Sequence, residues 1–349
     1  MKKNILISGG AGFIGSHVVR LFVNKYLNYN IINIDLLTYA GNLNNLTDIN
    51  KKSNYFFEKG DICNMQFIES IFDKYNITDI IHLAAESHVD RSIEDPFVFA
   101  KTNILGTLTL LEIAKRKWRG KNSLFYHIST DEVYGSLGDE GLFSETTNYD
   151  PHSPYSASKA SSDHFVRAYH DTYGLKTLIS NCSNNYGPYQ FPEKLIPLFI
   201  SNIINNQNLP IYGDGKNVRD WLFVEDHANA LLRIVKYGNV GETYNIGGSN
   251  QMTNYDVIIE ICSILDELAP KYNGKYSDLI KFVEDRPGHD YKYAIDAKKI
   301  SDELGWKPTE TFSSGLHKTV KWYLDNESWV KSILDGTYKN KYIELKDKS

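Results

Sequence analysis

A tyrosine and a lysine, Tyr155 and Lys159, are spaced so that they could act together on a proton. They lie in a helical pattern, and residues four positions apart share one helix face, so the phenol and the ammonium would be neighbours. A nearby cation favours phenolate and lowers the tyrosine pKa from its usual value of about 10. We therefore expect Tyr155 to serve as a base towards a sugar hydroxyl, although the same spacing also occurs in surface pairs.

Two adjacent carboxylates follow a candidate strand at 124–129. Thr130, Asp131 and Glu132 come directly after it, and in open parallel sheets ligands bind beyond the carboxyl ends of the strands. One interpretation is a solvated turn. The other is an acid and a base whose environments move their pKa values apart. Thr130 would then donate a hydrogen bond to the substrate oxygen that Tyr155 deprotonates.

A glycine-rich turn joins the first candidate strand to the first helical pattern, with the spacing GxxGxxG rather than GxGxxG. Glycines allow a tight turn and a close approach to a pyrophosphate, and the helix N-terminus offers free N–H groups and a positive dipole end. We expect a dinucleotide here. The residues predicted to hold its pyrophosphate are Gly9, Gly12, Phe13, Ile14 and Gly15.

An acidic residue, Asp35, follows the second candidate strand where a ribose-binding carboxylate is typical. It would accept hydrogen bonds from the adenosine ribose and repel a 2′-phosphate, and no arginine follows it in 36–39. The predicted cofactor is therefore NAD rather than NADP. Further cofactor contacts are expected from Asp61, Ile62, Ala84 and Ala85, and from Tyr155 and Lys159, whose ammonium would hold the nicotinamide ribose.

Alternating strand and helix patterns predict how these residues are positioned. The candidate strands are 4–8, 31–34, 55–58, 80–84 and 124–129, and the candidate helices are 13–27, 97–117 and 154–173. This order predicts an α/β fold with a Rossmann-like, doubly wound parallel sheet. After about residue 178 the rhythm is irregular, with helical patterns at 224–237, 254–268 and 313–325. We expect a cofactor-binding domain over 1–180 to which the chain later returns, a smaller C-terminal substrate lobe over 181–338, and a tail.

Several motifs together resemble one family. The glycine turn, the tyrosine–lysine pair and the strand-end threonine resemble the extended short-chain dehydrogenase/reductase superfamily. The segments 38–43, 85–92, 130–132, 219–221 and 286–290 are similar to the dTDP-glucose 4,6-dehydratases, with a likeness running from Lys3 to about Asp325. The resemblance implies that Tyr155 takes the C4 hydroxyl proton while hydride passes to NAD. It further implies that Glu132 removes the C5 proton, that Asp131 protonates the departing C6 hydroxyl, and that hydride returns to C6.

A sugar-nucleotide diphosphate needs local cations, because the net charge of −5 creates no general attraction for anions. Lys194, Arg219 and Arg286 are candidates, Arg being suited to bidentate phosphate contacts. The full set of residues expected at the substrate is Ser87, His88, Asn184, Glu193, Lys194, Leu195, Pro210, Tyr212, Arg219, Asn254, Arg286, His289 and Tyr293.

Alternative functions remain open on the sequence alone. Thymidine and uridine differ by one methyl group, worth only about 1–3 kcal/mol in a hydrophobic pocket, so UDP-glucose is the second candidate substrate. A nucleotide-sugar C4 epimerase would share NAD, Tyr155 and Lys159 but would not need a base at C5. A catalytically silent NAD-binding protein is also compatible with the fold.

Composition bears on the binding partners and on the cellular compartment of the protein. The balance of charges and a pI of about 6.1 argue against nucleic acid as a partner, and no apolar run approaches the roughly 18 residues of a membrane span. Three widely spaced cysteines fit reduced thiols in the cytoplasm, and no metal-ligand spacing is present. The family resemblance implies a homodimer formed through the helices at 97–117 and 154–173.

Overall fold

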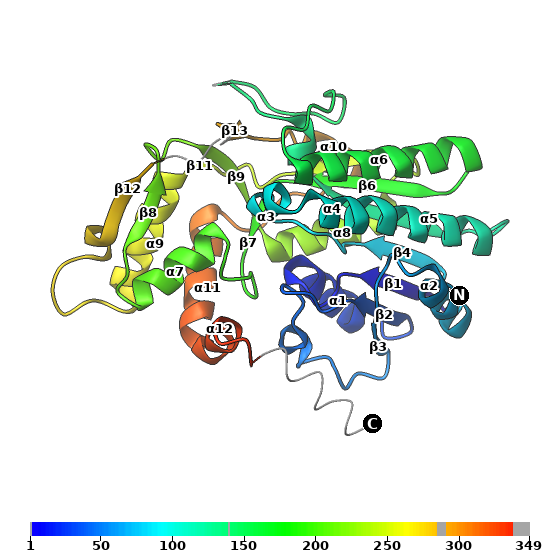
Figure 1. Cartoon of the computed structure of the whole chain (residues 1–349), viewed down its shortest axis with the longest axis horizontal. Coiled ribbons are helices and arrows are strands. Elements are labelled where there is room, and N and C mark those ends of the chain that lie inside the picture. Colours follow the sequence, from blue (N-terminus) through cyan, green and yellow to red (C-terminus); the bar gives the residue numbers. More distant parts are fainter. Residues whose placement is uncertain (1, 139, 285–290, 338–349) are drawn as a thin grey trace.

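The computed structural model describes residues 2–138, 140–284 and 291–337, and its centre is a seven-stranded parallel sheet (Figure 1). The strand order is β10-β6-β5-β4-β1-β2-β3, with every neighbouring pair parallel. The strands are β1 (Asn4–Ser8), β2 (Asn30–Asp35), β3 (Tyr55–Lys59), β4 (Asp79–His82), β5 (Leu124–Thr130), β6 (Thr177–Cys182) and β10 (Thr243–Ile246). The predicted doubly wound parallel sheet is confirmed, and β10 brings the later part of the chain back to its edge.

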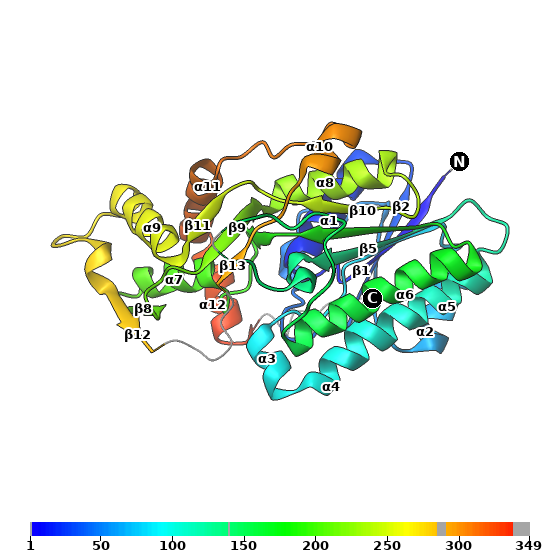
Figure 2. The ribbon, with the colours of Figure 1, turned by 90° about the horizontal axis from the view of Figure 1, so that it is seen from above.

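Helices cover both faces of the sheet (Figure 2). One face carries α1 (Phe13–Lys25), α8 (Val224–Tyr237) and α10 (Lys298–Leu304), and the other carries α2 (Met65–Tyr75), α5 (Gly106–Lys117) and α6 (Pro154–Tyr173). Alternation along β1 shows why two layers form: Ile5 and Ile7 pack in the core with α1, whereas Leu6 packs in the core with α2 and α5. Side chains point to opposite faces at successive strand positions, so both faces are apolar.

The helix expected over 97–117 is not a uniform α-helix. It consists of α4 (Pro96–Phe99), a π-helical segment (Ala100–Leu105) and α5, preceded by α3 (Val89–Glu94). The π segment widens the backbone around Asn103, whose buried side chain bonds both the N–H and the carbonyl of Glu86 at 2.9 and 3.0 Å. Sequence periodicity does not detect this bulge because it depends on a contact with the loop after β4. Helix α2 was not predicted at all.

A smaller lobe surrounds β9 (Val218–Phe223). Strand β9 pairs with β7 (Asn184–Tyr186), β11 (Gln251–Thr253) and β13 (Lys292–Tyr293). Separately, β8 (Leu209–Tyr212) pairs with β12 (Ile280–Val283). The helices of this lobe are α7 (Leu195–Ile204), α9 (Asn254–Leu268), α11 (Phe312–Asp325) and α12 (Glu327–Leu334). Short 3-10 turns span Leu43–Leu46 after β2, Asp131–Tyr134 after β5, and Tyr276–Leu279 after α9. The indole of Trp329 on α12 donates to Asn45 Oδ1 at 2.9 Å, which fastens this lobe to the loop after β2.

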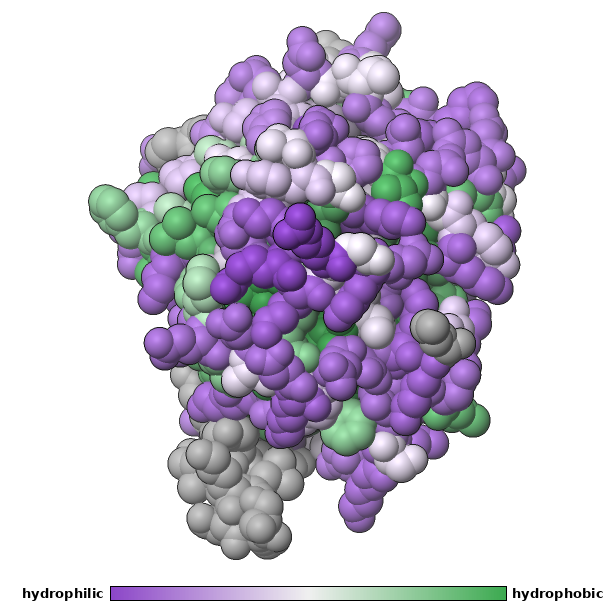
Figure 3. Space-filling view, turned by 90° about the vertical axis from the view of Figure 1, so that its right-hand side faces the viewer, coloured by the Kyte–Doolittle hydropathy of each residue, from purple (hydrophilic) through white to green (hydrophobic). Residues whose placement is uncertain are grey.

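Two features of the structure bear on whether part of the chain could lie in a membrane. The end of the molecule away from the smaller lobe is mostly hydrophilic (Figure 3). Within the described residues, the stretch Pro96–Lys117 has the length and mean hydropathy (1.3) of a membrane span. However, 44% of its most apolar window is buried inside the protein. A buried core helix passes the same test, so this stretch is weak support for a membrane segment.

The tight packing of the glycine turn predicts a stability effect. A Cβ at Gly15 would lie 2.0 Å from the carbonyl oxygen of Gly9, so α1 must shift away from β1 to accommodate it. We expect Gly15→Ala to lower the free energy of unfolding by about 1–3 kcal/mol. Gly138 is exposed with open space around its Cβ position, so Gly138→Ala should change it by less than about 0.5 kcal/mol. Urea denaturation of both variants measures the difference, and equal midpoints would contradict it.

Candidate active site

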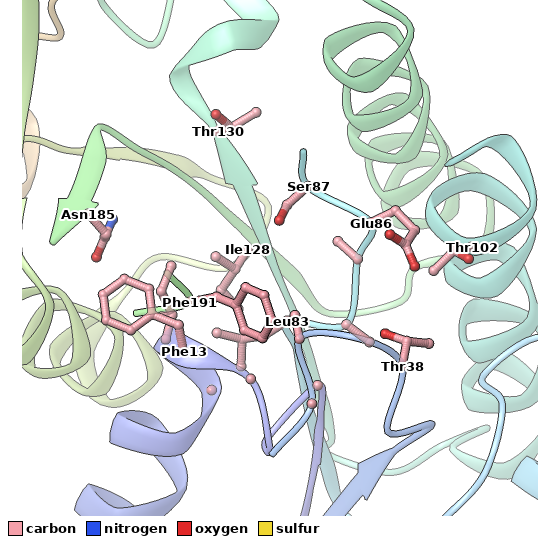
Figure 4. Close-up of a pocket in the computed structure, with 18 of the residues that line it drawn as sticks. Phe13, Thr38, Leu83, Glu86, Ser87, Thr102, Ile128, Thr130, Asn185 and Phe191 are labelled. Atoms are coloured by element: carbon pink, nitrogen blue, oxygen red, sulfur yellow. The ribbon is translucent and has the colours of Figure 1, made fainter. Parts of the chain in front are cut away.

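A cavity of about 330 Å³ opens at the carboxyl ends of the central strands (Figure 4). In Figure 4, Thr130 at the end of β5, Ser87 on the loop after β4, and Phe191 and Asn185 from the later part of the chain lie around the same space. The predicted residues that line it are Gly9, Gly12, Phe13, Ile14, Gly15, Asp35, Asp61, Ile62, Ala84, Ala85, Ser87, Thr130, Asp131, Glu132, Tyr155, Lys159, Asn184, Glu193 and Lys194. The sheet geometry therefore brings together segments that are distant in the sequence.

The glycine turn has the form of an anion cradle. Gly9 has a φ of +75°, and a Cβ there would lie 2.6 Å from the backbone nitrogen of Ala84, so only glycine fits. Helix α1 begins after Gly12 without a side-chain cap, which leaves N–H groups of its first turn open towards the cavity. These groups fit the pyrophosphate of a dinucleotide.

Asp35 is held rigidly beside the glycine turn. Its Oδ2 accepts from the Ala11 N–H at 2.9 Å and its Oδ1 from the Leu37 N–H at 2.8 Å. Burial raises the pKa of its carboxyl, and the two backbone N–H groups act in the opposite direction. The remaining lone pairs can accept ribose hydroxyls, while a 2′-phosphate would meet a buried acidic group.

Helix α6 presents the tyrosine–lysine pair to the cavity. Ser153 forms a capping box with Ser156 and Pro154 occupies the first turn, so the helix begins immediately before Tyr155. Both functional side chains are buried. The Lys159 Nζ donates to the carbonyl of Ile128 at 2.8 Å, and burial lowers its pKa to about 8.

The expectation that Lys159 lowers the pKa of Tyr155 is wrong for this structure. Burial raises the pKa of Tyr155 well above 10, and the negative charge of Glu132 adds to the rise, while contact with Thr130 acts against it. The spacing places both residues on one face, but it does not reveal how far the phenol is removed from water. Phenolate formation therefore requires further positive charge in the cavity.

The two adjacent carboxyl groups occupy unlike environments. Asp131 is 2% exposed, and its Oδ2 has no hydrogen-bond partner among the described residues, whereas Glu132 is half-buried at the cavity wall. Burial raises the pKa of Asp131 well above its usual value, with further contributions from Glu132 and Asp220. Asp131 is therefore suited to donate a proton, and its more exposed neighbour to accept one.

Several residues predicted for substrate binding do not line this cavity. Arg219 stacks on the ring of Tyr293 at 4.5 Å and donates to the Val218 carbonyl, and its charge reaches Asp131. The others are His88 at the start of α3, Leu195 opening α7, Pro210 and Tyr212 on β8, Asn254 opening α9, and Tyr293 itself on β13. Arg286 and His289 lie outside the described residues. All of these assignments stay predictions.

Other cavity residues were not predicted as site residues. Thr102 comes from the π-helical segment, Cys182 and Ser183 from the end of β6, and Gln190 and Phe191 from the loop after β7. Gln190 and Phe191 follow a Gly-Pro step that marked a loop, yet no local pattern tells which loop residues turn towards a ligand. The position of Cys182 at the carboxyl end of a strand was a usable signal.

The chain is similar in sequence to proteins of known family. The sequence model described as GDP-mannose 4,6 dehydratase matches residues 6–319. The dTDP-glucose 4,6-dehydratase of Salmonella typhimurium is 57% identical over 351 residues, covering 96% of this chain and 97% of the relative. That of Neisseria meningitidis is 55% identical over 347 residues, covering 97% and 98%.

A solved structure agrees with the sequence relatives. The dTDP-glucose 4,6-dehydratase of Bacillus anthracis, crystallised in complex with NAD, has a TM-score of 0.86 at 46% identity, covering 95% of this chain and 99% of that one. The agreement extends over both the sheet and the smaller lobe. The chain therefore belongs to the family described by the GDP-mannose 4,6 dehydratase model, among its dTDP-glucose 4,6-dehydratase members.

Proposed function

We infer that the protein is an NAD-dependent hydro-lyase that converts dTDP-glucose to dTDP-4-keto-6-deoxyglucose, a step of deoxysugar biosynthesis. The observation that carries this function is the pair of unlike carboxyl groups, Asp131 and Glu132, in one cavity with Tyr155 and the glycine turn. Relatives more than 50% identical over nearly the whole chain carry the same activity in their names.

The cavity residues divide the chemistry between them. Tyr155 takes the proton of the C4 hydroxyl, and Thr130 donates a hydrogen bond to the same oxygen. The 4-ketone acidifies C5–H, Glu132 removes that proton, and Asp131 gives its proton to the leaving C6 hydroxyl, so that water is lost. A proton returns to C5 when hydride is added at C6, which completes the 4-keto-6-deoxy sugar. This order requires Asp131 to be protonated at the start, which burial favours.

The residues present fit NAD on structural grounds. The tight Gly9 turn, the uncapped start of α1 and the fixed Asp35 carboxyl suit the pyrophosphate and an unphosphorylated ribose. Lys159, which lines the cavity about one helix turn after Tyr155, would hold the nicotinamide ribose. When bound, NAD supplies a cationic ring that accepts hydride from C4 and returns it to C6. We assign cofactor binding chiefly to residues 1–180 and sugar-nucleotide binding to 181–338.

The substrate assignment favours the thymidine nucleotide because the curated relatives act on it. Asn184, Glu193 and Lys194 reach the cavity from the smaller lobe, and Lys194 Nζ also donates to the Ser87 carbonyl at 3.3 Å. This contact closes the cavity between the two halves of the chain. A C4 epimerase would need neither a buried proton donor nor a base at C5, so the environment of Asp131 favours dehydration.

The proposal extends to a homodimer in the cytoplasm, without nucleic acid or membrane as a partner. Exposed apolar side chains project from the helices beside α6: Ile93 is 63% exposed, Phe97 84% and Leu105 53%. A second copy of the chain would cover this face. Three free cysteines and a net charge of −5 are ordinary for such a setting.

The reaction predicts products that differ in mass. Incubation with NAD and dTDP-glucose should yield a nucleotide sugar that has lost one water, with slower turnover of UDP-glucose. The loss is expected because elimination follows C4 oxidation within one cavity. Mass spectrometry of the products decides: an isomer of unchanged mass would support an epimerase, and no turnover of either sugar would contradict the proposed function.

Replacing the C5 base should separate oxidation from elimination. Glu132→Gln retains the side-chain volume but cannot remove the C5 proton, so reduced cofactor should accumulate at 340 nm while water loss slows by about 10²–10⁴-fold. Glu267→Gln, at an exposed site on α9, is the matched control and should behave like the parent protein. Elimination at the parent rate in Glu132→Gln would show that another residue is the base.

The exposed apolar face predicts the assembly. Phe97→Asp places a charge where a partner would cover an aromatic ring, so it should convert the dimer to a monomer. Sedimentation velocity measures the change. Tyr272→Asp, at a 99% exposed residue of the other lobe, should leave the dimer intact. A parent protein that sediments as a monomer would refute the assignment of this face.

A further inference from the structure

We propose that Asp163 is a positioning residue: beneath the cavity, it fixes the charge of Lys159 and the place of the β5 end that carries Thr130, Asp131 and Glu132. The inference rests on the proposed function. Tyr155, Lys159 and Asp163 occur at intervals of four on α6 and share its inward face. The third member of this row lines no part of the cavity, so it contacts neither substrate nor cofactor.

Asp163 collects hydrogen bonds from two other segments. Its side chain is fully buried, and its Oδ2 accepts from the hydroxyl of Ser129 at 2.9 Å and from that of Tyr149 at 2.8 Å. Ser129 directly precedes Thr130. The carboxylate therefore joins the helix that carries Tyr155 to the strand end that carries the acid and the base. Rotation or slippage of β5 against α6 would break this bond.

His127 connects the carboxylate to the lysine. Its Nε2 lies 3.2 Å from Asp163 Oδ1 and 3.4 Å from Lys159 Nζ, and all three groups are buried. The ammonium also donates to the Ile128 carbonyl. A buried ammonium is stable only with compensating negative charge nearby. Asp163 supplies that charge close by, since its carboxylate and the ammonium both contact the same ring nitrogen of His127.

The groups that face Lys159 from the other elements do not replace this charge. Burial lowers the pKa values of His127 on β5, to about 4, and of His82 on β4, whose rings lie 5.2 Å apart. Burial raises the pKa of Cys182 on β6 to about 12. These three groups are therefore neutral near pH 7.

Charged groups complete the surroundings of the lysine. On the cavity side stand Asp131, whose pKa burial raises, Glu132 and the phenol of Tyr155. On the far side, Arg167 donates to the Tyr149 hydroxyl at 2.8 Å. Burial alone would raise the pKa of Asp163. Hydrogen bonding to His127 and the positive charges near the carboxylate outweigh burial and lower this pKa below its usual value. Asp163 is thus a carboxylate at neutral pH.

The isosteric change Asp163→Asn tests the inference. The amide retains size but not charge, so the ammonium of Lys159 should be lost at lower pH. We expect the alkaline limb of the profile of kcat against pH to move down by about one pH unit or more relative to the parent protein. At pH 7, kcat should fall about tenfold or more, with KM for dTDP-glucose within about twofold of the parent, because no substrate contact is removed.

Two comparisons separate this role from a structural one. Asp171→Asn, at an exposed site on the same helix, should keep the parent profile. Ser129→Ala removes the bond to β5 but keeps the charge, so kcat should fall without a shift of the alkaline limb. A folded Asp163→Asn protein with the parent kcat and the parent alkaline limb would overturn the proposal. If Asp163→Asn does not fold, parental kcat in Ser129→Ala would overturn it. A parent protein that releases no water from dTDP-glucose refutes the function instead.

Discussion

The removal of water from the cavity floor is the constraint on which the chemistry depends. A charged group loses solvation there, so its protonation state is set by the neighbours that the fold supplies. Asp131 has few such partners and its pKa rises, whereas Lys159 has a carbonyl and a nearby carboxylate network and its pKa falls only to about 8. The same effect raises the pKa of Tyr155, so its side chain is a phenol near pH 7 in this structure. One physical cause, burial, therefore raises the pKa values of Asp131 and Tyr155 and lowers that of Lys159 within one cavity.

The parallel sheet explains why these groups converge. In a parallel sheet the carboxyl ends of all strands lie at one edge, so the turns after β1, β2, β4, β5 and β6 surround a common space. The glycine turn and Asp35 line one part of it, and the carboxyl groups of Asp131 and Glu132 line another. The smaller lobe closes the side that the sheet leaves open, through residues such as Asn184 and Lys194.

Much of this arrangement was predictable from local patterns. The helices at 154–173, 224–237 and 254–268 have the predicted bounds. The first and the third begin at local signals, Ser153 with Pro154 and Thr253, whereas the second has no side-chain cap and was predicted from its apolar periodicity alone. The π-helical segment within 97–117 and the helix α2 were missed, and the strand expected over 80–84 ends at His82. The π-helical segment depends on contacts with the loop after β4, to which hydrophobic periodicity is insensitive. Helix α2, in contrast, has local signals that were overlooked: Asn64 caps its start, and Ile68, Ile71 and Phe72 share one buried face.

The sequence by itself determined which groups are available and their order: a glycine turn before a helix, a carboxylate after the next strand, an acidic pair after the fifth, and Tyr155 with Lys159 on one helix face. Spacing along a chain defines such local geometry because backbone periodicity is fixed. Only the tertiary structure decided which of these groups lose water, why the pKa of Tyr155 rises rather than falls, and that Asp163 binds the β5 end to α6. Burial is a property of many segments packed together, so no single stretch of sequence contains it.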